Sequence, residues 1–139
     1  MAKLRMSPIA LSSIIQQKYC VESIFHLTCR DRNTIGFRQT FGSLCPWCTQ
    51  YPHTDRRSAS IGDHPDATGV FDVDSTGLIE IARCLNEGHD LKGNPLGAAT
   101  NFYIGTTANP GADDLDKEIL RLEGKKKAGA QFIQTQPRL

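Results

Sequence analysis

Residues 100–136 read TNFYIGTTANPGADDLDKEILRLEGKKKAGAQFIQTQ. This stretch predicts a strand over residues 100–105, a helix that begins at Asp114 and ends at Gly129, and a second strand over residues 131–136. The apolar residues of the helix recur on one of its sides: Leu115, Ile119 and Leu122. A strand, a helix and a strand in succession are typical of two parallel strands joined by a crossover helix.

The preceding part of the chain continues this alternation. Asp74 or Ser75 can cap a helix that ends at Gly88. The apolar residues of this helix follow the i, i+3, i+4, i+7 spacing of a buried face: Leu78, Ile81, Ala82 and Leu85. Residues 23–28 read SIFHLT and predict a short, mostly apolar strand.

One further helix is expected near the N-terminus. Ser7 followed by Pro8 is a good helix start, because a hydroxyl residue suits the cap position and proline suits the first helical position. The apolar residues that follow fall on one face: Leu11, Ile14 and Ile15. Alternating helices and strands with short glycine-bearing connections predict an α/β fold, in which helices cover a parallel sheet.

The composition restricts the kind of partner. The chain has 139 residues, and 16 basic against 15 acidic residues give it a net charge of +1. Proteins that bind nucleic acids or membrane surfaces usually need a basic face, so this balance argues against both and favours a small-molecule partner. The five cysteines lack the spacing of a disulfide framework, and residues 1–18 lack the pattern of a cleaved signal peptide. We therefore expect a cytoplasmic protein.

Three strings carry a family resemblance. Residues 26–33 read HLTCRDRN, residues 62–75 read GDHPDATGVFDVDS, and residues 127–137 read KAGAQFIQTQP. Together and in this order they resemble the methylenetetrahydrofolate reductase family, especially the reductase half of bifunctional enzymes that also carry a homocysteine S-methyltransferase domain. The resemblance covers residues 7–36 and 61–137.

The resemblance implies an activity and a fold. Members of the family are flavoproteins that reduce 5,10-methylenetetrahydrofolate to 5-methyltetrahydrofolate, with FAD as the cofactor and NADH or NADPH as the electron donor. Their fold is a (β/α)8 TIM barrel, which needs about 250 residues when it is closed. We therefore expect residues 1–139 to be a fragment of one barrel domain, with about four to five of the eight strand–helix units and with unpaired strand edges.

The resemblance also implies site residues near the flavin and the folate. His26 matches a histidine that lies against the flavin, and Phe71 and Asp72 match a loop that touches the flavin nucleotide. Gln136 matches a glutamine that hydrogen-bonds the folate ring, a role that suits an amide because it offers both a donor and an acceptor.

A second group of residues matches positions at the adenine and phosphate end of the cofactor: Asn109, Glu118, Arg121 and Lys125. Lysine and arginine would neutralise the diphosphate there, whereas Glu118 replaces a shorter acid. We assign no catalytic residue, because the family's general acid is a glutamate that would lie upstream of Met1, and we expect no metal. By the same resemblance the fragment is expected to be inactive alone, with an upstream methyltransferase domain or a second copy of the chain as its protein partner.

Residues 45–48, CPWC, offer a different interpretation. They resemble the dithiol of thioredoxin-like redox proteins, but that chemistry needs a cysteine at a helix N-terminus, and residues 49–57 show no helical pattern. A zinc site is disfavoured by its ligand spacing: Cys45, Cys48, His53 and His64. A thiol-disulfide redox module using Cys45 and Cys48 therefore remains an alternative, as does a non-catalytic fragment that binds another chain through an open sheet edge.

Residues 37–60 fit neither the alternation nor the family, and we expect them to be irregular. When the codons of residues 42–58 are read one nucleotide later, permitted codons give GAYALGVRNILTLTGDP, the kind of string that the family carries here. We therefore hypothesise two compensating frameshifts, near Phe37 and near Ser60. The chain as written is then expected to lack this strand and its aspartate.

Overall fold

The computed structural model describes residues 6–29, 31–42, 49–53 and 69–135. Within these ranges it contains helices and strands in alternation, listed here with their bounds: α1 (Pro8–Tyr19), β1 (Ile24–Thr28), α2 (Thr34–Gly42), β2 (Thr49–His53), α3 (Ser75–Asn86), β3 (Gly105–Ala108), α4 (Leu115–Ala128) and β4 (Phe132–Thr135). The α/β class expected from the sequence is confirmed. None of the helices in these ranges is long and apolar enough to cross a membrane.

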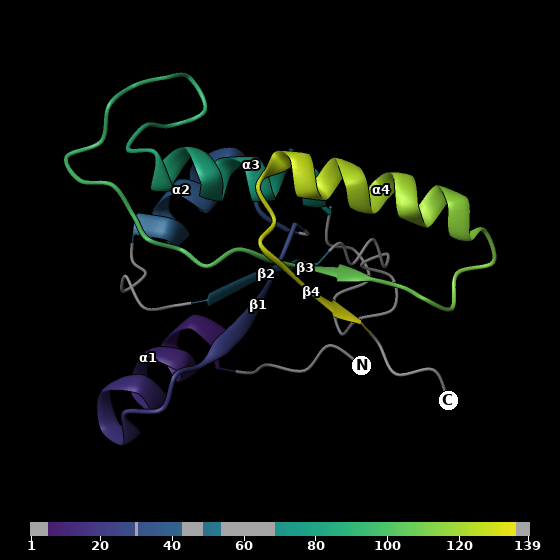
Figure 1. Ribbon diagram of the computed structural model, residues 1–139. Helices are drawn as coiled ribbons and strands as arrows, with labels where there is room; N and C mark the ends of the chain where they lie inside the picture. Colours follow the sequence, from purple (N-terminus) through teal and green to yellow (C-terminus); the bar gives the residue numbers. More distant parts are fainter. Residues whose placement is uncertain (1–5, 30, 43–48, 54–68, 136–139) are drawn as a thin grey trace.

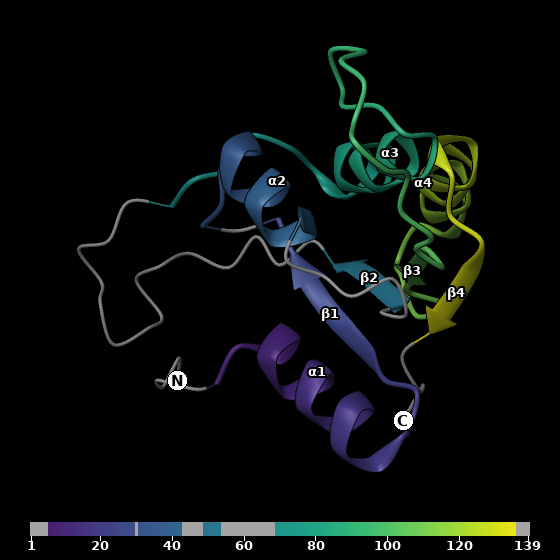
Figure 2. The same ribbon diagram turned by 90° about the vertical axis from the view of Figure 1, so that its left-hand side faces the viewer.

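The strands form two parallel ladders. In one ladder β1 pairs with β2, and in the other β3 pairs with β4. The strands β2 and β3 lie side by side, so the ladders follow one another across a single layer. Helices α2, α3 and α4 lie on one side of this layer, whereas α1 lies beside β1 on the other side (Figures 1 and 2). The strands with α2, α3 and α4 are consistent with part of a barrel wall that is open at β1 and at β4, whereas a helix on the opposite side, as α1 is here, is not part of such a wall.

The core lies between the strands and α2 and α3. The apolar stripe predicted on α3 is buried completely, because Leu78, Ile81 and Leu85 all face this core. Phe41 of α2 packs against Phe102, with ring centroids 5.6 Å apart. The remaining buried members of the cluster are Phe25, Leu27, Cys29, Phe37, Ile79, Ala82 and Ile104.

The apolar faces of the two outer helices are less buried than their patterns predict. On α4, Leu115 and Ile119 are 54% and 53% exposed. On α1, Leu11 and Ile14 are about half exposed, and Ser12 is the buried residue. Both helices lie at the ends of the strand layer, where a closed barrel would supply a neighbouring helix. The predicted faces are therefore wrong in part, because the buried residues of these helices are Lys125 on α4 and Ser12 on α1.

The strand expected over residues 100–105 is wrong in its position, because β3 begins only at Gly105. The side chain of Asn86 explains the difference. Its Oδ1 accepts hydrogen bonds from the hydroxyl of Thr100 (2.7 Å) and the N–H of Phe102 (2.8 Å), and its Nδ2 donates to the Phe102 carbonyl (2.9 Å). The backbone of residues 100–102 is thus bound by a side chain of α3 rather than by a neighbouring strand.

The expectation that residues 37–60 are irregular is also wrong in part. Residues 37–42 complete α2, because Phe37 and Phe41 are buried on its core side. Residues 49–53 form β2 and pair with β1 through backbone groups, which any residue except proline supplies in full. A strand therefore exists where none was expected. Residues 43–48 and 54–60, with Cys45 and Cys48, lie outside the described residues, as does His64.

Candidate functional site

Two groups of predicted site residues lie near the carboxyl ends of the strands. In a parallel layer these ends share one edge, and in barrel enzymes this edge carries the chemistry. His26 lies within β1, while Phe71 and Asp72 follow in a loop that contacts the segment after β1. Asn109 directly follows β3, and the rest of its group lies on α4. Gln136 lies outside the described residues.

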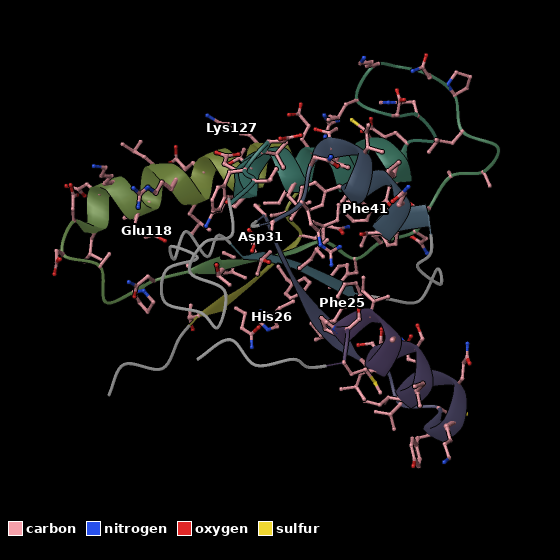
Figure 3. The ribbon with its side chains drawn as sticks, turned by 180° about the vertical axis from the view of Figure 1, so that it is seen from behind. Phe25, His26, Asp31, Phe41, Glu118 and Lys127 are labelled. Carbon is pink, nitrogen blue, oxygen red and sulfur yellow. The ribbon has the colours of Figure 1, made fainter. Side chains whose placement is uncertain are left out.

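His26 lies on the face of β1 that points away from the core. It is exposed, whereas its neighbours Phe25 and Leu27 are buried, as expected for side chains that alternate along a strand. Figure 3 shows His26 on the opposite side of the strands from α2, α3 and α4. In a barrel this face is the interior, so the position suits a side chain that contacts a bound molecule.

Phe71 and Asp72 are held against the beginning of α2. Phe71 forms a parallel bridge with Arg32, and its side chain is 49% exposed. The Asp72 carboxylate accepts hydrogen bonds from the backbone N–H of Thr34 at 2.9 Å and from its hydroxyl at 3.3 Å. Asp72 therefore satisfies a backbone donor at the N-terminus of α2, a partner that the sequence did not reveal. The ring of Phe71 remains available for stacking.

Asn109 and Glu118 together shape the loop after β3. The Glu118 carboxylate accepts a hydrogen bond from the backbone N–H of Asn109 at 3.1 Å, and the Asn109 side chain accepts one from the N–H of Gly111 at 3.0 Å. Asp114 then caps α4 by accepting from the N–H of Lys117. The longer side chain of Glu118 thus has a definite contact, with the protein backbone.

Arg121 and Lys125 lie on the same face of α4 as Glu118, because residues three and seven positions apart stack along a helix. Arg121 is exposed, and its guanidinium lies 3.6 Å from Glu118. Lys125 is only 8% exposed, and its Nζ donates a hydrogen bond to the carbonyl oxygen of Thr107 at 2.7 Å. The structure therefore brings this whole group together at the carboxyl end of β3.

The charge of Lys125 is unfavourable in its position. Burial lowers the pKa of its ammonium group below the usual value of 10.5; the carboxylate of Glu118 opposes this shift, and Arg121 adds to it. The carboxylate of Asp74, the cap of α3, also lies close enough to raise this pKa. A bound anion beside Lys125 would favour its charged form in the same way as Glu118 and Asp74 do.

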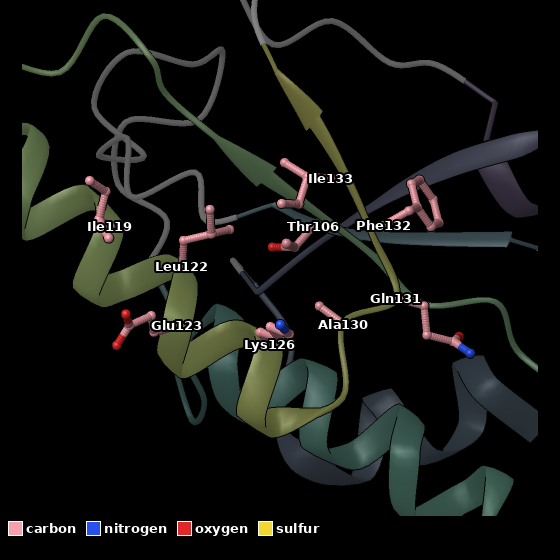
Figure 4. Close-up of a pocket in the computed structure, with 9 residues that line it drawn as sticks. All are labelled: Thr106, Ile119, Leu122, Glu123, Lys126, Ala130, Gln131, Phe132 and Ile133. Atoms are coloured by element: carbon pink, nitrogen blue, oxygen red, sulfur yellow. The ribbon is translucent and has the colours of Figure 1, made fainter.

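A groove lies beside this group, between α4 and β4. It has a volume of about 350 Å³ and contains the buried hydroxyl of Thr106, which has no hydrogen-bond partner among the described residues. Figure 4 shows the side chains that line the groove: Thr106, Ile119, Leu122, Glu123, Lys126, Ala130, Gln131, Phe132 and Ile133. The groove is mainly apolar and opens at the edge of the strand layer that β4 forms.

The comparison with protein families gives one match. Residues 2–137 match the family model described as methylenetetrahydrofolate reductase. No curated protein sequence matches the chain. The family match spans nearly the whole chain, including the residues between the two stretches that carry the resemblance.

Proposed function

Since the chain belongs to the methylenetetrahydrofolate reductase family, we propose that its reaction is the flavin-dependent reduction of 5,10-methylenetetrahydrofolate to 5-methyltetrahydrofolate. FAD is the proposed cofactor and NADH or NADPH the proposed electron donor. The proposal depends on the family match over residues 2–137, combined with the two cationic side chains of α4 at the end of β3, Arg121 and Lys125. The parallel α/β architecture supports it, because it is consistent with part of the family's barrel.

The residues present fit the anionic part of such a cofactor. Arg121 offers an exposed guanidinium, and Lys125 places an ammonium group at the end of β3. A diphosphate bound there would stabilise the charged form of Lys125, which burial disfavours. Glu118 fixes the loop at Asn109 that would border the phosphates. His26 would then contact the flavin from β1, and Phe71 and Asp72 would contact the flavin nucleotide from the loop before α3. Flavin, when bound, supplies the hydride that the methylene carbon receives.

We further propose that this chain binds flavin but does not complete the reaction alone. Hydride transfer requires the cofactor and the folate to be held in contact by a surrounding wall. The described strands form an open layer with unpaired edges at β1 and β4. Such a layer can bind one face of a ligand, but it leaves the opposite face to solvent.

The experiment is a flavin-binding assay with purified chain, followed by an assay for NADH or NADPH oxidation with the folate substrate. We expect the chain to retain the visible absorption of FAD after desalting and to show no turnover. A double variant, Arg121→Met with Lys125→Met, should bind at least about tenfold more weakly, because a charge-assisted phosphate contact contributes about 1.5–3 kcal/mol.

The matched control is Lys127→Met, which removes an exposed lysine from the same helix and should leave binding unchanged. Loss of FAD binding in the control, or binding by the double variant as tight as by the parent chain, would contradict the assignment of Arg121 and Lys125 to phosphate binding. Measurable turnover by the chain alone would contradict the inactivity.

A second candidate function is association with another copy of the chain. Ile133 of β4 and Ile119 of α4 are about half exposed beside the apolar groove, at an edge whose backbone groups can pair with a further strand. We expect a dimer in size-exclusion chromatography that Ile133→Lys converts to monomer. The control Ile35→Lys alters an isoleucine of α2 that is even more exposed. A monomeric parent chain, or equal effects of both variants, would exclude this candidate.

A further inference from the structure

A cluster of three potential metal ligands lies at the C-terminal end of α3. Cys84 is buried in the last turn of the helix, Glu87 is its C-cap residue, and His89 follows after one glycine. The sulfur of Cys84, a carboxylate oxygen of Glu87 and a ring nitrogen of His89 all lie within 4.8 Å of one another. The loop that follows extends away from the strands at the upper left of Figure 1, on the opposite side of the picture from β4.

The backbone brings these residues together by turning back on the helix. The N–H groups of Glu87 and His89 both donate to the carbonyl oxygen of Cys84, at 3.1 and 3.0 Å. Gly88 allows the turn, because its φ of +84° lies in the region that favours glycine. The position of His89 over the last turn is therefore fixed by main-chain bonds and does not depend on the side chains.

The ring of His89 is oriented as in a metal-binding histidine. Its Nδ1 lies 3.0 Å from the carbonyl oxygen of Asp90, and since a carbonyl only accepts, Nδ1 carries the proton. The lone pair of a neutral ring is then on Nε2. Metal-ligating histidines commonly donate their other ring N–H to a carbonyl in this way, which fixes the tautomer and the direction of the ring.

The contact between His89 and Glu87 places two potential ligand atoms side by side. Nε2 of His89 lies 3.0 Å from Oε2 of Glu87. A proton on Nε2 would satisfy this contact, and so would a metal ion bound to both atoms. The other carboxylate oxygen, Oε1, already accepts from the Arg83 guanidinium at 2.7 Å, which orients Glu87 with Oε2 towards His89.

The thiol of Cys84 adds a third potential ligand to this pair. Thiolate sulfur, imidazole nitrogen and carboxylate oxygen are the ligand types that bind Zn²⁺ in proteins. Two ligand atoms 3.0 Å apart and each about 2.1 Å from an ion subtend an angle of about 90° at the ion. The exposed Glu87 side chain can rotate to adjust the distance of its oxygen from an ion held by Cys84 and His89.

We propose that Cys84, Glu87 and His89 bind a divalent ion of the zinc type, with water as a fourth ligand. The Asp90 carboxylate is held within its own loop instead. Its Oδ1 accepts from the N–H groups of Lys92 and Asn94, both at 2.9 Å, and its Oδ2 accepts from the Asn94 side chain at 3.0 Å. The ion would fasten the end of α3 to the loop that begins at Gly88. Binding would displace the thiol proton of Cys84, whose pKa is raised by burial.

The experiment titrates the metal-free, reduced full chain with Co²⁺, because a cobalt–thiolate bond gives a charge-transfer absorption band. We expect this band in the parent chain, with displacement of Co²⁺ by Zn²⁺. The variants Cys84→Ser and His89→Gln should each weaken Co²⁺ binding by more than about 100-fold. Loss of a residue that only hydrogen-bonds a ligand typically costs about 10–100-fold, so a larger loss indicates direct coordination. Zn²⁺ should raise the melting temperature of the parent chain, and Mg²⁺ should not.

The controls separate this site from Cys20, Cys45 and Cys48. The double variant Cys45→Ser with Cys48→Ser, and the single variant Cys20→Ser, should keep the band at full strength. Glu87 is exposed and His89 is half-buried, so the variants Glu87→Gln and His89→Gln test the site even if Cys84→Ser impairs folding. A band that is absent from the parent chain, survives in His89→Gln, or disappears in the Cys45/Cys48 variant would overturn the proposal.

Discussion

The Nζ atom of Lys125 lies 2.7 Å from the carbonyl oxygen of Thr107, so a buried ammonium group of α4 donates a hydrogen bond to the backbone near the carboxyl end of β3. This relationship joins the helix and the strand of one βαβ unit through a single charged side chain. It also fixes the position of the charge that we assign to phosphate binding.

The pH dependence of stability follows from this contact. The folded-state pKa of Lys125 lies below its usual value of 10.5, so between these two values the unfolded chain binds more protons than the folded chain. The free energy of unfolding of the parent chain therefore increases as the pH rises through this window. We expect the parent chain to gain stability relative to Lys125→Met as the pH approaches 10.5, measured by urea unfolding. Parallel profiles for the two proteins would contradict this, and Lys127→Met serves as the control for loss of a surface charge.

Two glycines should respond to alanine in opposite directions. A Cβ atom at Gly105 would overlap the ring of Phe132, which stacks on Tyr103 with centroids 4.9 Å apart. We expect Gly105→Ala to lower the free energy of unfolding by about 1–3 kcal/mol, as overpacking does. Gly124 lies inside α4 with no atom within 4 Å of the added Cβ, so Gly124→Ala should raise it by about 0.5–1 kcal/mol. Equal signs in chemical denaturation would show that Phe132 does not approach β3 as described.

The cap of α4 can be tested with two adjacent aspartates. The Asp114 carboxylate accepts from the backbone N–H of Lys117 at 3.0 Å, so Asp114→Ala should cost about 1 kcal/mol of stability. The variant Asp113→Ala removes the same charge one residue earlier and should change stability by less than about 0.5 kcal/mol. Thermal unfolding of both variants is the measurement. A larger loss in Asp113→Ala would place the beginning of the helix one residue earlier.

The frameshift hypothesis makes a prediction about the coding DNA. Sequencing through the codons of residues 37–60 should show that the frame shifted by one nucleotide encodes a string like the one that the family carries. The presence of β2 does not decide this question, because main-chain pairing forms a strand with many sequences. A shifted frame that contains a stop codon or no similar string would refute the hypothesis.

The elements that the sequence predicted correctly are those whose determinants are local. The cap at Asp74 and the spacing of Leu78, Ile81 and Leu85 define α3, and the structure confirms both. Asp114 and Gly129 likewise bound α4 as expected. Each of these features depends on side chains within a few residues of the helix itself, and helical periodicity reveals them directly.

The features that the sequence did not reveal depend on distant partners. The beginning of β3 is set by the side chain of Asn86, 16 residues before Phe102, and Asp72 binds the backbone of Thr34 across 38 residues. For the candidate site, the grouping of Glu118, Arg121 and Lys125 followed from helix geometry, but the bond to Thr107 did not. The exposure of Leu115 depends on what covers α4, which no pattern within the helix can show.

The division of the strands into two ladders separates the molecule into two supersecondary units. One consists of β1, α2 and β2, and the other of β3, α4 and β4; among the described residues, no ladder of backbone hydrogen bonds joins β2 to β3. Side-chain packing through α3 and the core beneath it contributes to this boundary. Each unit can therefore unfold locally as a cooperative unit. Amide hydrogen exchange in β3 and β4 can then become faster while exchange in β1 stays unchanged.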